Sequence, residues 1–163
     1  ALSRQFAAHT VDRRYTAVVG GHPVPPVGRI EGALARSTAN RQKMAIVGEG
    51  RGKHAITHYR TMRALRRSAQ VECRLETGRT HQIRVHMASI GHSLLGDATY
   101  GRTPGNLSGV LKEIGFVRQA LHAATLGFVH PTTQEKLSFA SALPADIVEL
   151  IGRLSLESPA GAE

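Results

Sequence analysis

Residues 74–101 read R-L-E-T-G-R-T-H-Q-I-R-V-H-M-A-S-I-G-H-S-L-L-G-D-A-T-Y-G. The run V-E-C-R-L-E at 71–76 leads into this stretch and alternates apolar with polar residues, which is typical of a half-buried strand. Thr77 and Gly78 break the alternation, and a helical pattern starts near His81. The sequence therefore predicts a strand-to-helix junction.

Cationic and titratable side chains gather at this junction. They are Arg74, Arg79, Arg84, His81, His86 and His92. A helix N-terminus presents unpaired N–H groups and a partial positive charge. The junction is therefore suited to bind a phosphate or a carboxylate.

The helix that follows has a clear apolar face. Ile83, Met87 and Ile90 recur at i, i+4 and i+7, and Gly91 is placed to end the helix. Arg84 lies at the border of this face, so we expect it to stand at the edge of a cleft.

The remaining patterns predict a chain of short strands with few helices. Strands are expected at Tyr15–Val19, Val27–Gly32, Met44–Val47, His54–Leu65, Gln70–Glu76, Ala120–Val129 and Glu135–Ala140. Helices are expected within 1–12, over His81–Ile90, over Val110–Val117 and after Pro144. The glycine cluster G-E-G-R-G at 48–52 lacks the ending of a nucleotide-binding loop and is read as a hairpin turn.

Length and composition indicate one domain over 1–154 and a tail over 155–163. The single cysteine, Cys73, excludes a disulfide scaffold and favours a reducing compartment, so the expected location is cytoplasmic. The sequence has no signal peptide and no apolar run of membrane-spanning length. The opening A-L-S-R-Q-F lacks an initiator methionine and is read as the interior of a longer protein.

Charge is concentrated in the first half of the chain. The net charge is +9, and 16 of the 21 lysines and arginines but only 5 of the 12 acidic residues lie in residues 1–84. Such asymmetry favours a polyanion partner, although a solvated arginine-rich surface has the same composition. Arginine makes up 17 of the basic residues, which favours phosphate and nucleic-acid binding because its planar fork matches phosphate.

Several other kinds of site lack their defining residues. The nine histidines come with no cysteine set and no H-E-x-x-H, so no metal site is predicted. A serine hydrolase would need a motif such as G-x-S-x-G, which is absent. Glu72 and Glu76 are out of phase with the apolar face, and Asp97 follows Gly96 in a turn, where it is read as a turn stabiliser.

The sequence does not show which carboxylate would pair with Arg84. A buried arginine needs a carboxylate, and no acid of the chain is an obvious candidate, so either Arg84 is exposed or its partner lies elsewhere. The simplest alternative for the whole junction is a solvated helix start capped by Thr80.

The stretch from Leu75 to Gly101 closely resembles the signature of the ribosomal large-subunit pseudouridine synthase family of the RluA type. Further segments resemble the same family: R-R-Y-T-A-V-V-G at 13–20, G-K-H-A-I-T-H-Y-R at 52–60, L-H-A-A-T-L-G-F-V-H-P at 121–131 and F-A-S-A-L-P at 139–144. The resemblance covers residues 4–152, with Ser93 where the family usually has proline. It implies an α+β fold with a mixed, mainly antiparallel sheet flanked by helices.

The resemblance also implies roles for individual residues. Arg84 would pair with the catalytic aspartate, Tyr15 would stack against the target uracil, and Ile83 would line the base pocket. The remaining implied substrate-binding or bracing residues are Arg79, Thr80, His81 and Gln82. No cofactor and no metal are implied.

The implied reaction is conversion of uridine to pseudouridine in RNA, with 23S ribosomal RNA as the expected substrate and transfer RNA as an alternative. The family's aspartate lies in an H-R-L-D motif upstream of the tyrosine motif, and this chain has no such motif. We therefore expect a fold that is incomplete at the N-terminus and a chain that is inactive by itself. The alternatives are a non-catalytic RNA-binding module of the same fold and, from charge alone, a DNA-binding protein.

Overall fold

The computed structural model describes residues 2–156, which fold around a six-stranded sheet with the order β2-β5-β6-β1-β7-β8. Its strands are β1 (Asp12–Gly20), β2 (Val27–Glu31), β5 (Ile56–Leu65), β6 (Ser68–Leu75), β7 (Leu121–Val129) and β8 (Lys136–Ala140). A separate hairpin is made of β3 (Ala33–Arg36) and β4 (Met44–Val47). The helices are α1 (Leu2–Ala7), α2 (Gln82–Ser89), α3 (Gly105–Ile114) and α4 (Ala145–Leu154).

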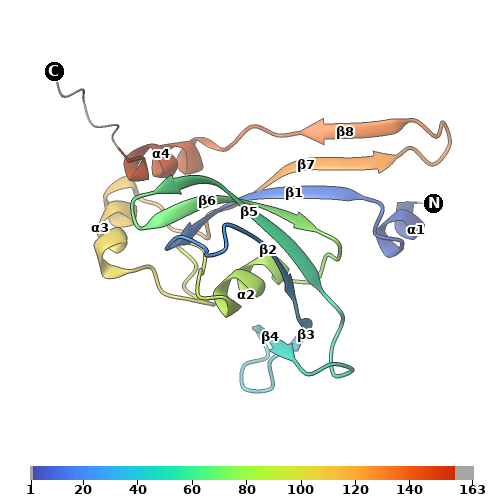
Figure 1. Ribbon diagram of the computed structural model, residues 1–163, viewed down its shortest axis with the longest axis horizontal. Helices are drawn as coiled ribbons and strands as arrows, with labels where there is room; N and C mark the ends of the chain where they lie inside the picture. Colours follow the sequence, from blue (N-terminus) through green and yellow to red (C-terminus); the bar gives the residue numbers. More distant parts are fainter. Residues whose placement is uncertain (1, 157–163) are drawn as a thin grey trace.

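The helices cover the sheet unequally. Figure 1 shows α2 under the sheet, α3 and α4 together at one end, and α1 near the other end beside the projecting β7–β8 hairpin. The predicted α+β class is confirmed, and every strand pair among the described residues is antiparallel.

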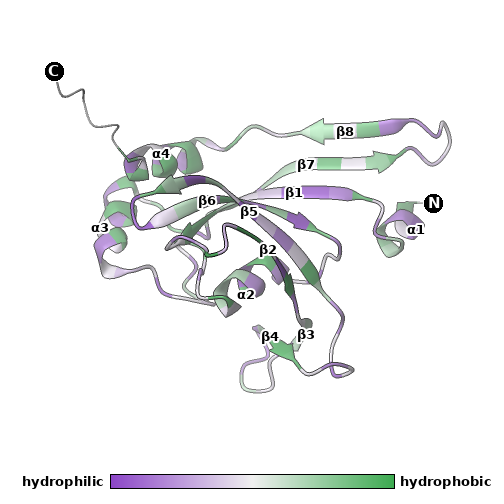
Figure 2. Cartoon of the chain, in the orientation of Figure 1, coloured by the Kyte–Doolittle hydropathy of each residue, from purple (hydrophilic) through white to green (hydrophobic). Residues whose placement is uncertain are grey.

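Two apolar clusters lie on opposite faces of the sheet. The cluster under α2 joins Ile83 and Met87 to Ala17, Val71 and Cys73 on the sheet. The cluster under α3 and α4 contains Val18, Leu65, Leu95, Leu107, Leu111, Ile147, Leu150, Ile151 and Leu154. In Figure 2 the ribbons of α3 and α4 alternate between green and purple segments, whereas β1 is purple near its N-terminal end. All the buried residues of α4 belong to this cluster, so the predicted last helix packs an apolar face against the sheet.

The predicted strands are present, and β5 and β6 form a hairpin, but other elements differ from the predictions. The strand β3 was not predicted, and the glycine cluster at 48–52 joins β4 to β5 in different sheets, so it is a turn but not a hairpin turn. Helix α3 begins earlier than predicted and ends at Gly115, whose φ of 67° is the left-handed conformation that glycine adopts readily. Ile90 lies outside α2 and is 37% exposed, so it does not extend the buried face.

The tail predicted at 155–163 lies almost wholly outside the described residues. Within 2–156, no helix is long and apolar enough to cross a membrane.

Candidate active site

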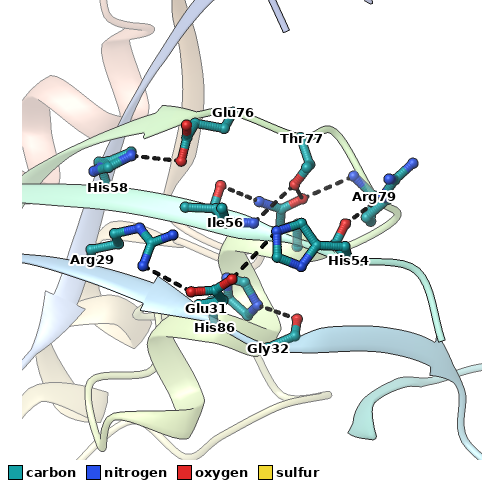
Figure 3. A network of polar contacts seen from close by, with 11 residues as sticks. Arg29, Glu31, Gly32, His54, Ile56, His58, Glu76, Thr77, Arg79 and His86 are labelled. Carbon is teal, nitrogen blue, oxygen red and sulfur yellow. Dashed lines mark hydrogen bonds and ion pairs between the residues drawn. The ribbon is translucent and has the colours of Figure 1, made fainter. Parts of the chain in front are cut away.

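The strand-to-helix junction is held by the side chain of Gln82. Its Oε1 accepts hydrogen bonds from Thr77 Oγ1 at 2.7 Å and from the backbone N–H of Arg79 at 3.0 Å. Its Nε2 donates to the carbonyl of Ile56 at 2.9 Å and to Thr57 Oγ1 at 3.0 Å, as Figure 3 shows in part. Gln82 is 2% exposed. Gln82 therefore fixes the loop before α2 to β5. Of the two roles implied for it, substrate binding and bracing, this geometry corresponds to bracing.

The hydrogen-bond chain continues from Thr57 to the sheet edge through His86. Thr57 Oγ1 lies 2.8 Å from His86 Nδ1. His86 Nε2 lies 3.0 Å from the carbonyl of Gly32 (Figure 3). A carbonyl only accepts, so the ring proton belongs on Nε2 and Nδ1 accepts from Thr57. Burial lowers the pKa of His86, which keeps the ring neutral in the folded protein.

We expect the free energy of unfolding to decrease as the pH drops below about 6.5. In that range His86 becomes protonated in the unfolded chain, whereas its buried ring stays neutral in the folded protein. Urea unfolding of the protein between pH 8 and pH 5 measures this dependence. Replacing His86 with glutamine should reduce the slope relative to that of the wild type. An unaltered slope in the His86 variant would contradict the assignment.

A hollow of about 250 Å³ opens in front of α2. Its walls come from β1, β6, the junction, α2 and the start of β7: they are Tyr15, Leu75, Arg79, His81, Gln82, Ile83, Arg84, Gln119 and Leu121. Six of the seven predicted site residues thus lie together. The seventh, Thr80, lines a neighbouring hollow instead.

Tyr15 reaches this hollow from the central strand. Its Cα pairs with Cys73 of β6 on one side and with Ala123 of β7 on the other. The register with β7 shifts between Arg14 and Tyr15, which is the signature of a bulge. The extra residue is Ala124 of β7, because Arg14 pairs with Thr125 and Tyr15 with Ala123, so the bulge lies beside the tyrosine predicted to stack on a base.

Arg84 has a carboxylate partner within the chain, which corrects the expectation that none of its acids was a candidate. Its Nε and Nη2 donate to the two oxygens of Asp97 at 2.8 and 2.9 Å. The Arg84 side chain is 12% exposed and that of Asp97 is 1% exposed. Arg84 Nη1 takes no part in this fork, so one edge of the guanidinium remains for another acceptor.

Asp97 also stabilises the turn, as predicted. Its Oδ1 accepts from the backbone N–H groups of Thr99 at 3.1 Å and Tyr100 at 3.3 Å. Burial alone would raise the pKa of Asp97, but the hydrogen bonds and charge of Arg84, with these N–H groups, outweigh burial and lower it. The hydrogen bond to Asp97 in turn raises the pKa of Arg84, so both groups are charged.

Tyr100 connects Arg84 and His81 to the β3–β4 hairpin. The Arg84 guanidinium carbon lies 4.9 Å from the centre of the Tyr100 ring. The Tyr100 hydroxyl accepts from the backbone N–H of Met44 at 2.9 Å and lies 2.6 Å from His81 Nδ1. The hydroxyl therefore donates its own proton to His81, and a neutral His81 carries its ring proton on Nε2. Burial and the charge of Arg84 lower the pKa of His81, in agreement with this state.

The helix start differs from the capped alternative. The residue before α2 is His81, with φ 55° and ψ 20°, and no side chain caps the helix there. Thr80 is therefore not the cap. A non-glycine residue in this left-handed region is uncommon, and the bonds of Gln82 and Tyr100 on either side hold His81 in it.

Sequence reasoning missed four features of the site: the partner role of Asp97, the packing of Tyr100, and the wall residues Gln119 and Leu121. Outside this hollow, the buried Nε of Arg13 has no hydrogen-bond partner within residues 2–156, and its guanidinium lies over the ring of Phe6. Within residues 2–156, no group of three histidine, cysteine, aspartate or glutamate side chains could hold a metal ion.

Comparisons with known proteins give the family and the fold. The family model described as RNA pseudouridylate synthase matches residues 1–89, which is more than half of the chain. The chain belongs to this family, and to its RluA type.

Among relatives, the chain is 52% identical over 157 residues to ribosomal large subunit pseudouridine synthase D of Zymomonas mobilis, covering 96% of this chain and 49% of that protein. It is 44% identical over 153 residues to the uncharacterized RNA pseudouridine synthase YlyB of Bacillus subtilis, covering 94% of this chain and 47% of the relative. The chain thus spans about half the length of these curated relatives.

Solved structures give the same result for the fold. Human RNA pseudouridylate synthase domain containing 4 superposes with a TM-score of 0.75 at 26% identity, covering 97% of this chain and 67% of that one. Human RNA pseudouridylate synthase domain containing 1 gives a TM-score of 0.68 at 29% identity, covering 87% of this chain and 58% of that one. The predicted pseudouridine synthase fold is therefore confirmed.

Proposed function

We propose that the full-length protein to which this chain contributes converts uridine to pseudouridine in RNA, with 23S ribosomal RNA as its substrate. The observation that carries the proposal is the hollow that joins Tyr15, Ile83 and an Arg84 held by Asp97. Membership of the family and the names of the relatives support the reaction and the ribosomal substrate.

In this reaction the N1–C1′ bond breaks, the uracil turns in the pocket, and C5 bonds to C1′. The proton leaves C5 and N1 becomes protonated, so the conversion is an isomerisation that consumes no co-reactant. The target base must leave its stack to enter the site. The hollow of about 250 Å³ has apolar walls at Leu75, Ile83 and Leu121, which suit the faces of a single nucleobase.

We assign residues 1–154 to a partial catalytic domain whose aspartate comes from outside these 163 residues. Arg84 would receive that carboxylate on Nη1, because Asp97 occupies Nε and Nη2. A cation in hydrogen-bonding contact with a carboxylate keeps that carboxylate ionised. Arg79, Thr80 and His81 would contact the RNA, and Gln82 would hold the junction that presents them.

Tyr15 provides a direct test of base stacking. Replacing Tyr15 with alanine in the full-length protein should lower kcat/KM by about 10- to 100-fold, the range expected when one base loses its aromatic platform. Replacing it with phenylalanine keeps the ring and should retain most of the activity. Initial rates of tritium release from RNA labelled at uridine C5 measure both. An alanine variant as active as the wild type would refute the stacking role.

The competing hypothesis is a non-catalytic RNA-binding module of the same fold. Tritium release from C5-labelled 23S ribosomal RNA by the full-length protein separates the two, because a binding module would retain RNA and release none. Transfer RNA labelled in the same way tests the alternative substrate.

We also propose that the protein is cytoplasmic, because its single cysteine, Cys73, is suited to a reducing compartment. Cys73 is buried, and burial raises its pKa to about 12, so it would remain a thiol.

A further inference from the structure

A second hollow lies beside the candidate active site, between the β3–β4 hairpin and the loop at 78–80. Its volume is about 390 Å³, and its lining consists of Leu34, Ala35, Arg36, Met44, Gly52, Lys53, Gly78, Arg79 and Thr80. Three of these residues are cationic and none is acidic. The hollow therefore combines apolar side chains with uncompensated positive charge.

The walls of this hollow are anchored to the body of the protein. Leu34 is 1% exposed and packs with Ala55 and Val85. The backbone of Met44 is tied to Tyr100 by a 2.9 Å hydrogen bond. Arg79 Nε donates to the carbonyl of His54 at 2.9 Å (Figure 3). These contacts attach both sides of the hollow to α2 and the main sheet, so its shape does not depend on a ligand.

Arg79 lines both this hollow and the one that contains Tyr15 and Arg84. The two hollows therefore adjoin each other at Arg79. The two hollows together are suited to a chain-like ligand that places one unit in each. A nucleic-acid strand is such a ligand, since each unit has an apolar base and an anionic phosphate.

We propose that the second hollow binds the nucleotide next to the target uridine. Its base would lie against Ala35 and Met44, and its phosphate would be held by Arg36, Lys53 and Arg79. Apolar and aromatic surfaces accept bases of any sequence, whereas lysine and arginine bind the backbone. The proposal rests on the proposed function, because it takes RNA as the substrate of the adjoining site.

The test uses the full-length protein and fluorescence anisotropy with a single-stranded RNA hexamer that has one uridine among adenosines. Replacing Lys53 or Arg36 with alanine should weaken binding several-fold and reduce the slope of log K against log salt by about 0.7 for each phosphate that the protein no longer neutralises. Arg41, on the turn of the same hairpin, is the matched control because it is exposed and does not line the hollow. Its alanine variant should bind within about twofold of the wild type, the small effect expected of a charge that binds no phosphate.

A second arm tests the base. Removing the base on one side of the uridine, to leave an abasic sugar, should weaken wild-type binding by about tenfold, the effect of losing one stacked base. Replacing Ala35 with leucine fills the hollow without changing its charge. This variant should bind the intact hexamer more weakly than the wild type does. Removal of the neighbouring base from the RNA should then have little further effect on its binding.

Equal losses in the Arg36, Lys53 and Arg41 variants would overturn the proposal, since they would indicate a diffuse basic surface. It would also fail if neither abasic hexamer bound more weakly than the intact RNA. The proposed function is tested separately by tritium release. The full-length protein could show the expected losses of RNA binding in the variants and yet release no tritium. This result would refute the isomerase assignment and would indicate that the second hollow is the binding site of an RNA-binding module.

Discussion

Replacing Arg84 with alanine is expected to lower the rate of pseudouridine formation by the full-length protein by at least about 100-fold, the usual cost of removing an electrostatic group at a reacting centre. The reason is that the catalytic carboxylate would be left without its cation. Tritium release from C5-labelled RNA at saturating substrate measures the effect, which should fall mainly on kcat because Arg84 would act on the reacting groups.

Two further variants give this experiment its controls. Lysine at position 84 keeps the charge but cannot hold two acceptors in a fork, so its rate should lie between those of alanine and the wild type. Arg153, an exposed arginine on α4, can be replaced with alanine to lose the same charge far from the hollow, and the rate should be unchanged. A near-wild-type rate in the Arg84→Ala protein would overturn the assignment.

Replacing Asp97 with asparagine is expected to destabilise the protein by about 3–5 kcal/mol, the typical cost of breaking a buried ion pair from one side. Asparagine can still accept the N–H groups of Thr99 and Tyr100, so the turn is preserved and the effect of the charge is isolated. For a protein of this size the melting temperature should fall by about 6–20 °C. Thermal unfolding followed by circular dichroism measures the shift.

The Arg118–Asp146 pair provides a matched control. It has the same forked geometry, with distances of 2.8 and 3.0 Å, but its side chains are 40% and 45% exposed. Replacing Asp146 with asparagine should therefore cost no more than about 1 kcal/mol. Equal shifts in the two variants would show that burial of the Arg84–Asp97 pair has no energetic consequence.

The pKa of Asp97 is lowered in the folded protein, so the contribution of its carboxylate to the free energy of unfolding should depend on pH. The contribution should be complete above about pH 4 and disappear as the pH falls further.

The strands and helices that the sequence predicted are those with local signals. The alternation of V-E-C-R-L-E predicted β6, and the spacing of Ile83 and Met87 predicted α2, because each pattern is complete within one element. Strand β3 was missed because A-L-A-R contains no β-branched residue, and its extended form depends on pairing with β4. The early start of α3 was missed because glycine, asparagine and serine in its first turn disfavour a helix interior.

The candidate site was predicted in part. The residues at 79 and 81–84 were recognised because they adjoin one another in sequence, and Tyr15 was placed with them by resemblance. The pairing of Arg84 with Asp97 was missed because the connecting segment must turn back on α2, and no local pattern determines its path. Tyr100 and Leu121 were missed for the same reason, since contacts between distant segments depend on the packing of the whole sheet.

The Arg84–Asp97 fork changes the interpretation of the junction. Arg84 is not an unpaired cation waiting for a distant carboxylate, since Asp97 already fixes its orientation. The proposed catalytic aspartate is then a second partner, which approaches a guanidinium that is already positioned. Pre-organisation of this kind lowers the cost of arranging the charge at the moment of reaction.

The most direct test of the central claim compares tritium release from C5-labelled 23S ribosomal RNA by the full-length protein and by the 163-residue chain. We predict release by the full-length protein, with matching formation of pseudouridine, and none by the chain alone. Turnover by the 163-residue chain would contradict the claim that the catalytic aspartate lies outside it, and the absence of release from the full-length protein would contradict the isomerase function itself.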